Sequence, residues 1–334
     1  MRSAALTGYA ELAQSLGLDP HAQLRAAGLD LACLNQPDLH VPIASIHNLL
    51  EASALAAGIE DFGLRLAAAR RLSNLGPIAL AAREEPTVRD AMLCLHRTLH
   101  MHNDALRIDM DEGQGIAVVS AHVLALLHGT PRQGIELIVG VMSRVVRDFI
   151  GERWLPRSVC FMHAAPHDMA PYRRVFGVTP PFNSVLNGIT CRSEDLAQPM
   201  PGADAESLRT IRQCIPSAAE QDDTYTERTV RLILRLLPAG RCCVDLVARQ
   251  LGVDRRSLHR RLEVEGTTFT RLLDEFCQEA ALRHIDNPAR SVTELASMLG
   301  FSDASTFSHW FSRRFGQSPL AWRARRHLPG QRPK

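Results

Sequence analysis

The chain has 334 residues, of which 46% are hydrophobic and 22% are charged. These values are typical of globular proteins and exclude a disordered chain, and the length favours about two domains. No stretch reaches the roughly 20 apolar residues of a membrane span, and Glu11 interrupts the first 18 residues, so we expect a cytoplasmic protein.

The charge is unevenly distributed along the chain. Residues 225–334 contain 19 Lys and Arg and 11 Asp and Glu, a net charge of +8, whereas residues 1–224 contain 19 and 25, a net charge of −6. Clustered cations attract a polyanion, whereas an acidic domain repels one. The charge distribution therefore indicates a polyanion partner for the C-terminal region only. Only Lys334 is a lysine, and the planar fork of arginine suits phosphate and guanine, although an arginine-rich genome would give the same bias.

The first two hundred residues predict a helix-rich α+β domain. Apolar spacing and capping side chains predict helices at 7–17, 42–57, 61–70, 88–102 and 131–150. Two strand-like runs at 106–110 and 115–120, separated by the turn residues 111–114, predict a β-hairpin.

Three histidines near the end of the fourth predicted helix raise the question of a metal site. His96 and His100 have a metal-ligand spacing on a helix, and His102 and Asp104 follow them. No further Cys or carboxylate completes a ligand set. The favoured interpretation is therefore that these histidines make ordinary hydrogen bonds at a polar helix end. We expect neither a metal nor a cofactor, and keep His96 and His100 as candidate effector contacts.

Aromatic residues follow between 172 and 182. Tyr172, Phe176 and Phe182 have the spacing of core residues, which is the favoured interpretation, and Tyr172 and Phe182 are also candidate effector contacts. No nucleophile elbow, zinc-protease or phosphate-loop motif is present, so we expect no enzyme. A hydrolase that uses one of the histidines is the alternative, which a turnover screen tests.

A connection is predicted between residues 201 and 224. Pro201, Gly202 and Pro216 interrupt helical spacing, and the polar residues 221–224 can cap a helix at 225–237. The eight cysteines show no Cys-x-x-Cys spacing, and vicinal cysteines do not bridge easily, so we expect reduced and mostly buried thiols.

The C-terminal region contains one unit twice. Residues 247–253 and 295–301 match in pattern at a constant offset of 48, with an apolar residue, a small Ala, a Leu at helical spacing and then a Gly. The Ala lets two helices cross closely, and the Gly lets the chain leave the helix with a positive φ. This pattern predicts two helix-turn-helix units in an all-helical domain.

The helix after each turn is expected to meet DNA. Asp254 and Ser302 are suitable N-caps, and Leu258 and Leu262 form the buried stripe of the first helix. The candidate groove-facing residues are Arg255, Arg256, Ser257, His259, Arg260, Arg261, Asp303, Ala304, Ser305, Thr306, Ser308, His309 and Arg313.

A helix is predicted at 269–285, between the two units. Its length of roughly 26 Å, with the flanking turns, can separate two recognition helices by about one DNA turn of 34 Å. The alternative is that each pattern forms only a packed helical hairpin, and one copy of the pattern alone would favour this alternative. Two copies, two capped helices and opposite domain charges favour DNA binding, although any single arginine can still belong to a solvated face.

These residues resemble the AraC/XylS family of bacterial regulators, over about 227–326. The matching residues are 260–262, 266–269, 294–303, 305–307, Phe311, Arg313, 315–319 and 322–323. Cys277 departs from the family, whose members usually carry an Arg there, and Arg314 replaces a commonly aromatic residue. The resemblance implies a sequence-specific transcription regulator whose first recognition helix often makes the stronger base contacts.

The N-terminal region resembles the arabinose-binding-type sensor domain of that family, at 12–29, 163–167, Tyr172, 176–177 and 182–183. This resemblance implies a small-molecule effector without implying a sugar. We therefore expect an effector-sensing and dimerisation domain at 1–200, a linker at 201–224 and a double helix-turn-helix domain at 225–334. We also expect a homodimer that activates transcription with RNA polymerase; a constitutive architectural DNA binder is the alternative.

Overall fold

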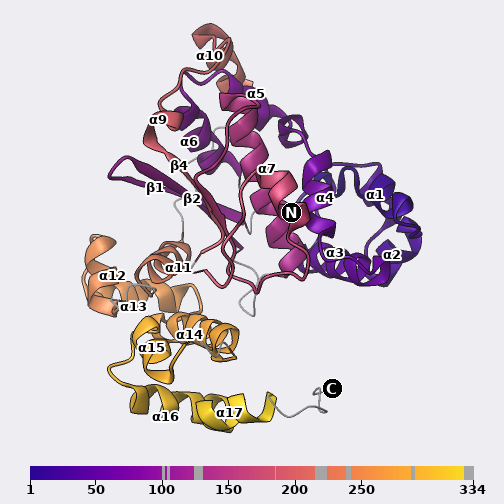
Figure 1. Ribbon diagram of the computed structural model, residues 1–334. Coiled ribbons are helices and arrows are strands. Elements are labelled where there is room, and N and C mark those ends of the chain that lie inside the picture. Colours follow the sequence, from indigo (N-terminus) through magenta and orange to yellow (C-terminus); the bar gives the residue numbers. More distant parts are fainter. Residues whose placement is uncertain are drawn as a thin grey trace. The chain divides into compact units, whose positions relative to one another are not determined.

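The computed structural model describes residues 1–99, 102–103, 106–123, 131–184, 186–214, 224–237, 242–286 and 290–326. These residues form two compact units, the first before residue 215 and the second after residue 223 (Figure 1). Among the described residues, no helix is both long and apolar enough to cross a membrane.

The first unit is rich in helices. Its short 3-10 helices are η1 (Ser3–Leu6), η2 (Leu31–Leu34) and η3 (Leu72–Leu75). Its α-helices are α1 (Tyr9–Ser15), α2 (Pro20–Ala26), α3 (Ile43–Ala57), α4 (Phe62–Ala69), α5 (Pro77–Arg83), α6 (Val88–Thr98), α7 (Arg132–Ile150), α8 (Ala170–Phe176), α9 (Ser193–Leu196) and α10 (Ala205–Cys214). The five predicted helices are present as α1, α3, α4, α6 and α7.

One antiparallel sheet completes the first unit. It contains β1 (Leu106–Gly113), β2 (Ile116–Val123), β3 (Ser158–Cys160) and β4 (Gly188–Arg192), in the spatial order β1-β2-β4-β3. The predicted hairpin is confirmed, but its turn lies later than expected, at Gln114 and Gly115, which both have positive φ. Strands β3 and β4 were not predicted, because they are short.

Helix α7 contributes to both apolar cores of this unit. One core joins its Val146 and Phe149 to the sheet, and the other joins its Leu137 to helices α1–α4. Helices α4 and α7 approach closely, since a Cβ atom at Gly140 would lie 2.6 Å from the Cβ of Ala67. The sheet and the N-terminal helices are therefore held by one long helix.

The segment that we expected to be a linker contains a helix. Residues 205–214 form α10, which packs against α5, with Ile211 beside Ala81 and Cys94. The Arg212 guanidinium pairs with the Glu85 carboxylate at 2.6 Å. Pro201 and Pro216 flank this helix rather than interrupt it, which explains the difference.

The second unit is helical throughout its described residues. Its helices are α11 (Tyr225–Leu236), α12 (Val244–Gln250), α13 (Arg255–Val264), α14 (Phe269–Ile285), α15 (Val292–Met298), α16 (Ala304–Phe315) and α17 (Pro319–Arg326). The predicted fold class, a helix-rich α+β unit followed by an all-helical one, is confirmed. The connecting helix also has its predicted bounds.

Candidate nucleic-acid interface and sensor cavity

The first helix-turn-helix consists of α12, a short turn and α13. The chain leaves α12 at Gly252, which has a φ of +68°. The Val253 N–H donates to the Ala248 carbonyl at 3.0 Å, which satisfies an acceptor at the end of the helix. Ala248 and Leu258 are both buried, so the small side chain lies at the crossing of the two helices.

Asp254 begins α13. Its carboxylate accepts from the Ser257 backbone N–H at 2.8 Å and from the Ser257 hydroxyl at 2.9 Å. These hydrogen bonds hold the pKa of Asp254 below its usual value, because they stabilise the charged carboxylate. The predicted cap is therefore confirmed, and it fixes the start of the helix.

The second unit uses the same turn between α15 and α16. Gly300 has a φ of +75°, and the Phe301 N–H donates to the Ala296 carbonyl at 2.9 Å. Ser291 and Glu294 form the predicted capping box, in which the Ser291 N–H donates to the carboxylate at 2.6 Å and the Glu294 N–H donates to the hydroxyl at 3.1 Å.

The cap of α16 differs from the prediction. Asp303, rather than Ser302, begins the helix: its carboxylate accepts from the Thr306 N–H at 2.7 Å and from the hydroxyls of Ser302 and Thr306 at 2.8 and 2.9 Å. The offset of 48 therefore ends after Val253 and Phe301, and the second turn is one residue longer than the first. The Asp303 carboxylate and the Thr306 hydroxyl are thus hydrogen-bonded to each other at the helix start. Both side chains are exposed, and their contact with the groove stays a prediction.

The exposed face of α13 is strongly basic. Arg255, Arg256 and Arg260 are exposed, and no carboxylate pairs with them within the described part of the chain. Arg261 differs, since its guanidinium lies 4.2 Å from the centre of the Tyr225 ring on α11. His259 is half-buried, and the Ser257 hydroxyl is engaged by the cap. The basic face thus consists of three of the predicted residues.

The corresponding face of α16 carries less charge. Ser305, His309 and Arg313 are exposed, Ala304 is half-buried, and the Ser308 hydroxyl donates to the Ala304 carbonyl at 2.7 Å. Behind this face, the Trp310 indole N–H donates to Asp274 of α14 at 2.6 Å. This hydrogen bond ties α16 to the connecting helix and was not predicted.

Helix α14 is held at both ends. Thr268 caps its start through the Arg271 N–H, and the Arg323 guanidinium donates to the carbonyls of Ile285 and Arg290 at 2.6 and 2.7 Å. Cys277 is buried and its thiol contacts the Leu299 carbonyl, so this position packs against α15. The connecting helix is thereby fixed to the second helix-turn-helix.

Among the described candidate effector residues, Tyr172 and Phe182 lie together, with ring centroids 5.3 Å apart. His96 contacts the Ile108 carbonyl of β1 through Nδ1, and His100 lies outside the described residues. Tyr172 is fully buried beside Phe161, and the Phe182 ring stacks on Phe161 at 5.5 Å. Tyr172 and Phe182 thus belong to an aromatic cluster, as the core interpretation predicted.

A buried polar group lies beside this aromatic cluster. The Tyr172 hydroxyl donates to the Glu136 carboxylate and accepts from the Arg132 guanidinium at 2.9 Å. Arg132 Nε also donates to Glu136 at 2.8 Å, and His163 Nε2 lies 3.4 Å from the same carboxylate. Burial raises the pKa of Glu136 to about 7, more than its hydrogen bonds lower it.

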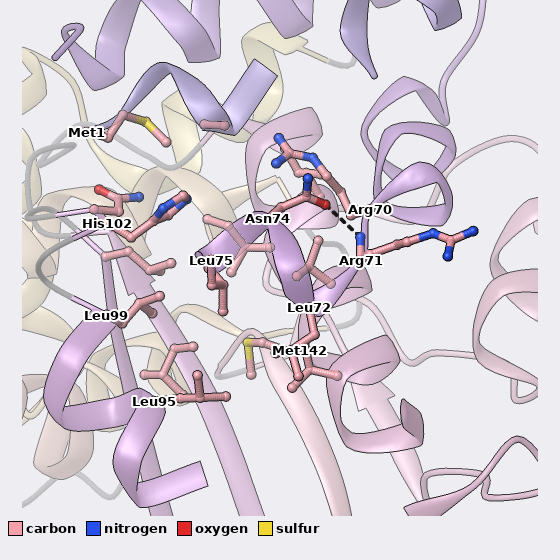
Figure 2. A pocket seen from close by; sticks show the side chains of 18 of the residues that line it. Met1, Arg70, Arg71, Leu72, Asn74, Leu75, Leu95, Leu99, His102 and Met142 are labelled. Carbon is pink, nitrogen blue, oxygen red and sulfur yellow. Dashed lines mark hydrogen bonds between the residues drawn. The ribbon is translucent and has the colours of Figure 1, made fainter. Parts of the chain in front are cut away.

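A cavity of about 120 Å³ lies elsewhere in the first unit. Figure 2 shows Arg70, Asn74 and His102 along its upper edge, with Leu95, Leu99 and Met142 below them. Its lining comes from η1, η3, α6, β1 and α7, and most of it is aliphatic. Sequence reasoning missed this site, because its residues share no local spacing.

Comparisons with known proteins agree with this division of the chain. Residues 17–200 match the family described as the arabinose-binding domain of AraC transcription regulator, N-terminal, and residues 247–325 match a helix-turn-helix domain. The HTH-type transcriptional regulator VirS of Mycobacterium tuberculosis is 32% identical over 327 residues, which cover 97% of this chain and 96% of VirS. The chain belongs to the AraC/XylS family of transcription regulators.

Two further proteins resemble this AraC-type regulator along most of its length. The ornithine utilization regulator of Pseudomonas aeruginosa is 24% identical, over 94% of this chain and 93% of that protein. The crystal structure of the transcriptional regulator CdpR from Pseudomonas aeruginosa is 22% identical, with a TM-score of 0.45, over 91% of this chain and 96% of that one. The two family models and the match to VirS show a DNA-binding transcription regulator with an arabinose-binding-like sensor domain.

Proposed function

We propose that this regulator binds one promoter sequence with α13 and α16 in successive major grooves. The observation that carries the proposal is the pair of capped recognition helices on either side of the 17-residue helix α14. At 1.5 Å per residue, that helix is roughly 26 Å long, which with its turns matches one turn of DNA. The exposed arginines of α13 supply the stronger contacts, and α16 adds weaker ones.

We further propose that a small effector bound in the first unit changes this activity. A ligand shifts a protein between states only by binding one of them more tightly. The expected output is activation of a nearby promoter through RNA polymerase, with two chains on paired half-sites. Binding of two linked DNA-binding units to one operator raises affinity through effective concentration.

The test is binding of the full chain to its own upstream DNA, measured base by base with single-site operator variants. Arg256→Ala and His259→Ala are expected to relax preference at one base each, at a cost of about 1–3 kcal/mol per specific contact. Arg174→Ala is the matched control, because Arg174 is also exposed but lies in the first unit. Uniform weakening on all sequences would instead make both residues phosphate contacts.

Activation and dimerisation need separate measurements. Transcription from the same promoter with purified RNA polymerase is expected to rise when the regulator is added, and a fall would make it a repressor. Sedimentation of the free protein and of its operator complex is expected to show two chains per operator. A single chain per operator would remove the dimer from the proposal.

A further inference from the structure

The cavity of the first unit combines an apolar body with one buried positive charge. Leu72, Leu95, Leu99 and Met142 line the body. Arg70 lies at the edge of the same cavity and is only 6% exposed. Aliphatic walls suit a hydrocarbon, whereas a buried guanidinium requires an acceptor, so the two features together describe an amphipathic ligand.

Arg70 lacks a negative partner within the described residues. One of its nitrogens donates to the Ala4 carbonyl at 2.8 Å, and its Nε has no hydrogen-bond partner there. Burial lowers its pKa to about 10, so the guanidinium still carries its charge at neutral pH. A buried charge without a partner destabilises a fold, and a ligand carboxylate would match the planar fork of the guanidinium.

His102 supplies a second polar contact at this edge. It is 8% exposed, and its Nδ1 has no partner within the described residues. Burial, together with the charges of Arg2 and Arg70, lowers its pKa to about 4, so the ring is neutral at pH 7. A neutral imidazole can donate one N–H to a carboxylate oxygen, while the neighbouring arginines keep the surroundings positive.

We propose that this cavity binds a small aliphatic monocarboxylate, with its carboxylate on Arg70 and His102 and its chain among the leucines. The inference rests on the proposed function, since it names the class of the effector. The volume limits the ligand: an apolar cavity of about 150 Å³ accommodates benzene, so this smaller one accommodates a chain of about five carbons beside the carboxylate. Hexanoate is therefore the probe of choice.

The test is calorimetric titration of the full chain with hexanoate, hexan-1-ol and acetate. Hexanoate is expected to bind at least tenfold more tightly than hexan-1-ol, which lacks the charge, and than acetate, which lacks the chain. Arg70→Met is expected to lower hexanoate affinity at least tenfold, and Arg70→Lys to restore part of it. Equal binding of hexanoate and hexan-1-ol, or no binding of hexanoate, would overturn the proposal.

Two further variants separate the site from a general effect on folding. Arg71→Met is the matched control, because Arg71 is exposed and its guanidinium points away from the apolar side chains in Figure 2. Leu75→Phe fills the cavity and is expected to abolish binding while the melting temperature does not fall. Unchanged hexanoate affinity in Leu75→Phe would place the ligand elsewhere and overturn the proposal.

Operator binding distinguishes this inference from the proposed function. Without ligand, Arg70→Met is expected to bind the operator as the parent protein does. If hexanoate fails to bind while operator binding persists, only the ligand class is wrong. If hexanoate binds as expected but leaves transcription unchanged, the ligand class stands and the proposed effector response is wrong.

Discussion

The two units use arginine in opposite ways. In the first unit, Arg132 pairs with the fully buried Glu136 at 2.8 Å, four residues along helix α7. In the second, Arg271 pairs with Glu275 at 3.0 Å with the same spacing on α14, but its side chain is 67% exposed. The spacing and the partner type are the same, but burial differs, and Arg132 also donates to the Tyr172 hydroxyl.

Burial therefore decides what an arginine can do in this protein. In the sensor unit, Arg70 is buried and Arg132 is half-buried, and each needs a specific acceptor, which a small ligand can also supply. On α13, three exposed arginines face solvent without carboxylate partners in the described residues, which suits the long polyanion of the DNA backbone. Variants of the two kinds of arginine test this contrast.

Loss of the buried pair is expected to have the largest effect. Arg132→Met leaves the Glu136 carboxylate buried without its cation, which is expected to lower the free energy of unfolding by about 3–5 kcal/mol. Arg271→Met breaks the exposed pair with the same spacing and is expected to cost less than about 1 kcal/mol. Urea unfolding of both variants measures the difference, and equal losses would contradict the contrast.

The buried carboxylate also predicts a pH dependence of stability. Because the pKa of Glu136 is raised from 4.5 to about 7 in the folded protein, its contribution to stability is fully present below pH 4.5 and is lost as the pH rises to about 7. Roughly 3 kcal/mol is at stake, and Glu136→Gln is expected to flatten this slope. The Glu136 carboxylate also interacts with the charged or titratable side chains of Arg132, Tyr172, His163 and Glu51. The free energy of unfolding is therefore compared between the parent protein and Glu136→Gln from pH 4 to pH 8. An unchanged slope in Glu136→Gln would assign the pH dependence to those groups.

The turn of the second helix-turn-helix is expected to tolerate no side chain. Gly300→Val places a β-branched residue at a φ of +75°, which is expected to cost about 1–3 kcal/mol and to abolish operator binding. Gly113→Val is the control, since Gly113 lacks a positive φ and has open space around it. Retained binding by Gly300→Val would mean that this turn does not set the recognition helix.

The helix caps give a smaller and more local effect. Asp303→Ala removes the acceptor of the Thr306 N–H and is expected to cost about 1 kcal/mol. Ser302→Ala, one residue earlier, removes only a hydroxyl that donates to Asp303, and is expected to cost clearly less. Thermal unfolding distinguishes the two positions, and a larger loss in Ser302→Ala would restore the shorter turn that the repeat predicted.

The smallest expected effect concerns Arg261. Because its guanidinium stacks on the Tyr225 ring, Arg261→Ala is expected to lower stability by about 0.5–1 kcal/mol. Its effect on operator affinity is expected to be smaller than that of Arg256→Ala, whose side chain is exposed. A larger loss of affinity in Arg261→Ala, measured by operator titration, would place Arg261 in the groove.

Most of the second unit could be predicted from the sequence, although helix α17 was not. Its helices are marked by local signals, such as the caps Asp254 and Ser291 and the paired glycines, and these signals lie within a few residues of the structure that they specify. The extra residue before α16 was missed, because Ser302 and Asp303 are both good caps and the repeat favoured the first.

The first unit could be predicted only in part. Its long helices have clear apolar spacing, but β3 has three residues and β4 has five, too few for a reliable alternation. The cavity joins Arg70 to His102 and both to α7, so no local pattern reveals it. Whether an arginine is buried without a negative partner depends on the three-dimensional fold, so the sequence alone does not show it.

The most direct test of the central claim is binding of the full chain to its own upstream DNA and to scrambled DNA across a salt series. We predict selective binding to the upstream sequence, with an affinity that falls steeply with salt as the arginines of α13 release counterions from phosphates. Binding that is absent, or that is insensitive to both sequence and salt, would contradict the assignment of α13 and α16 as recognition helices.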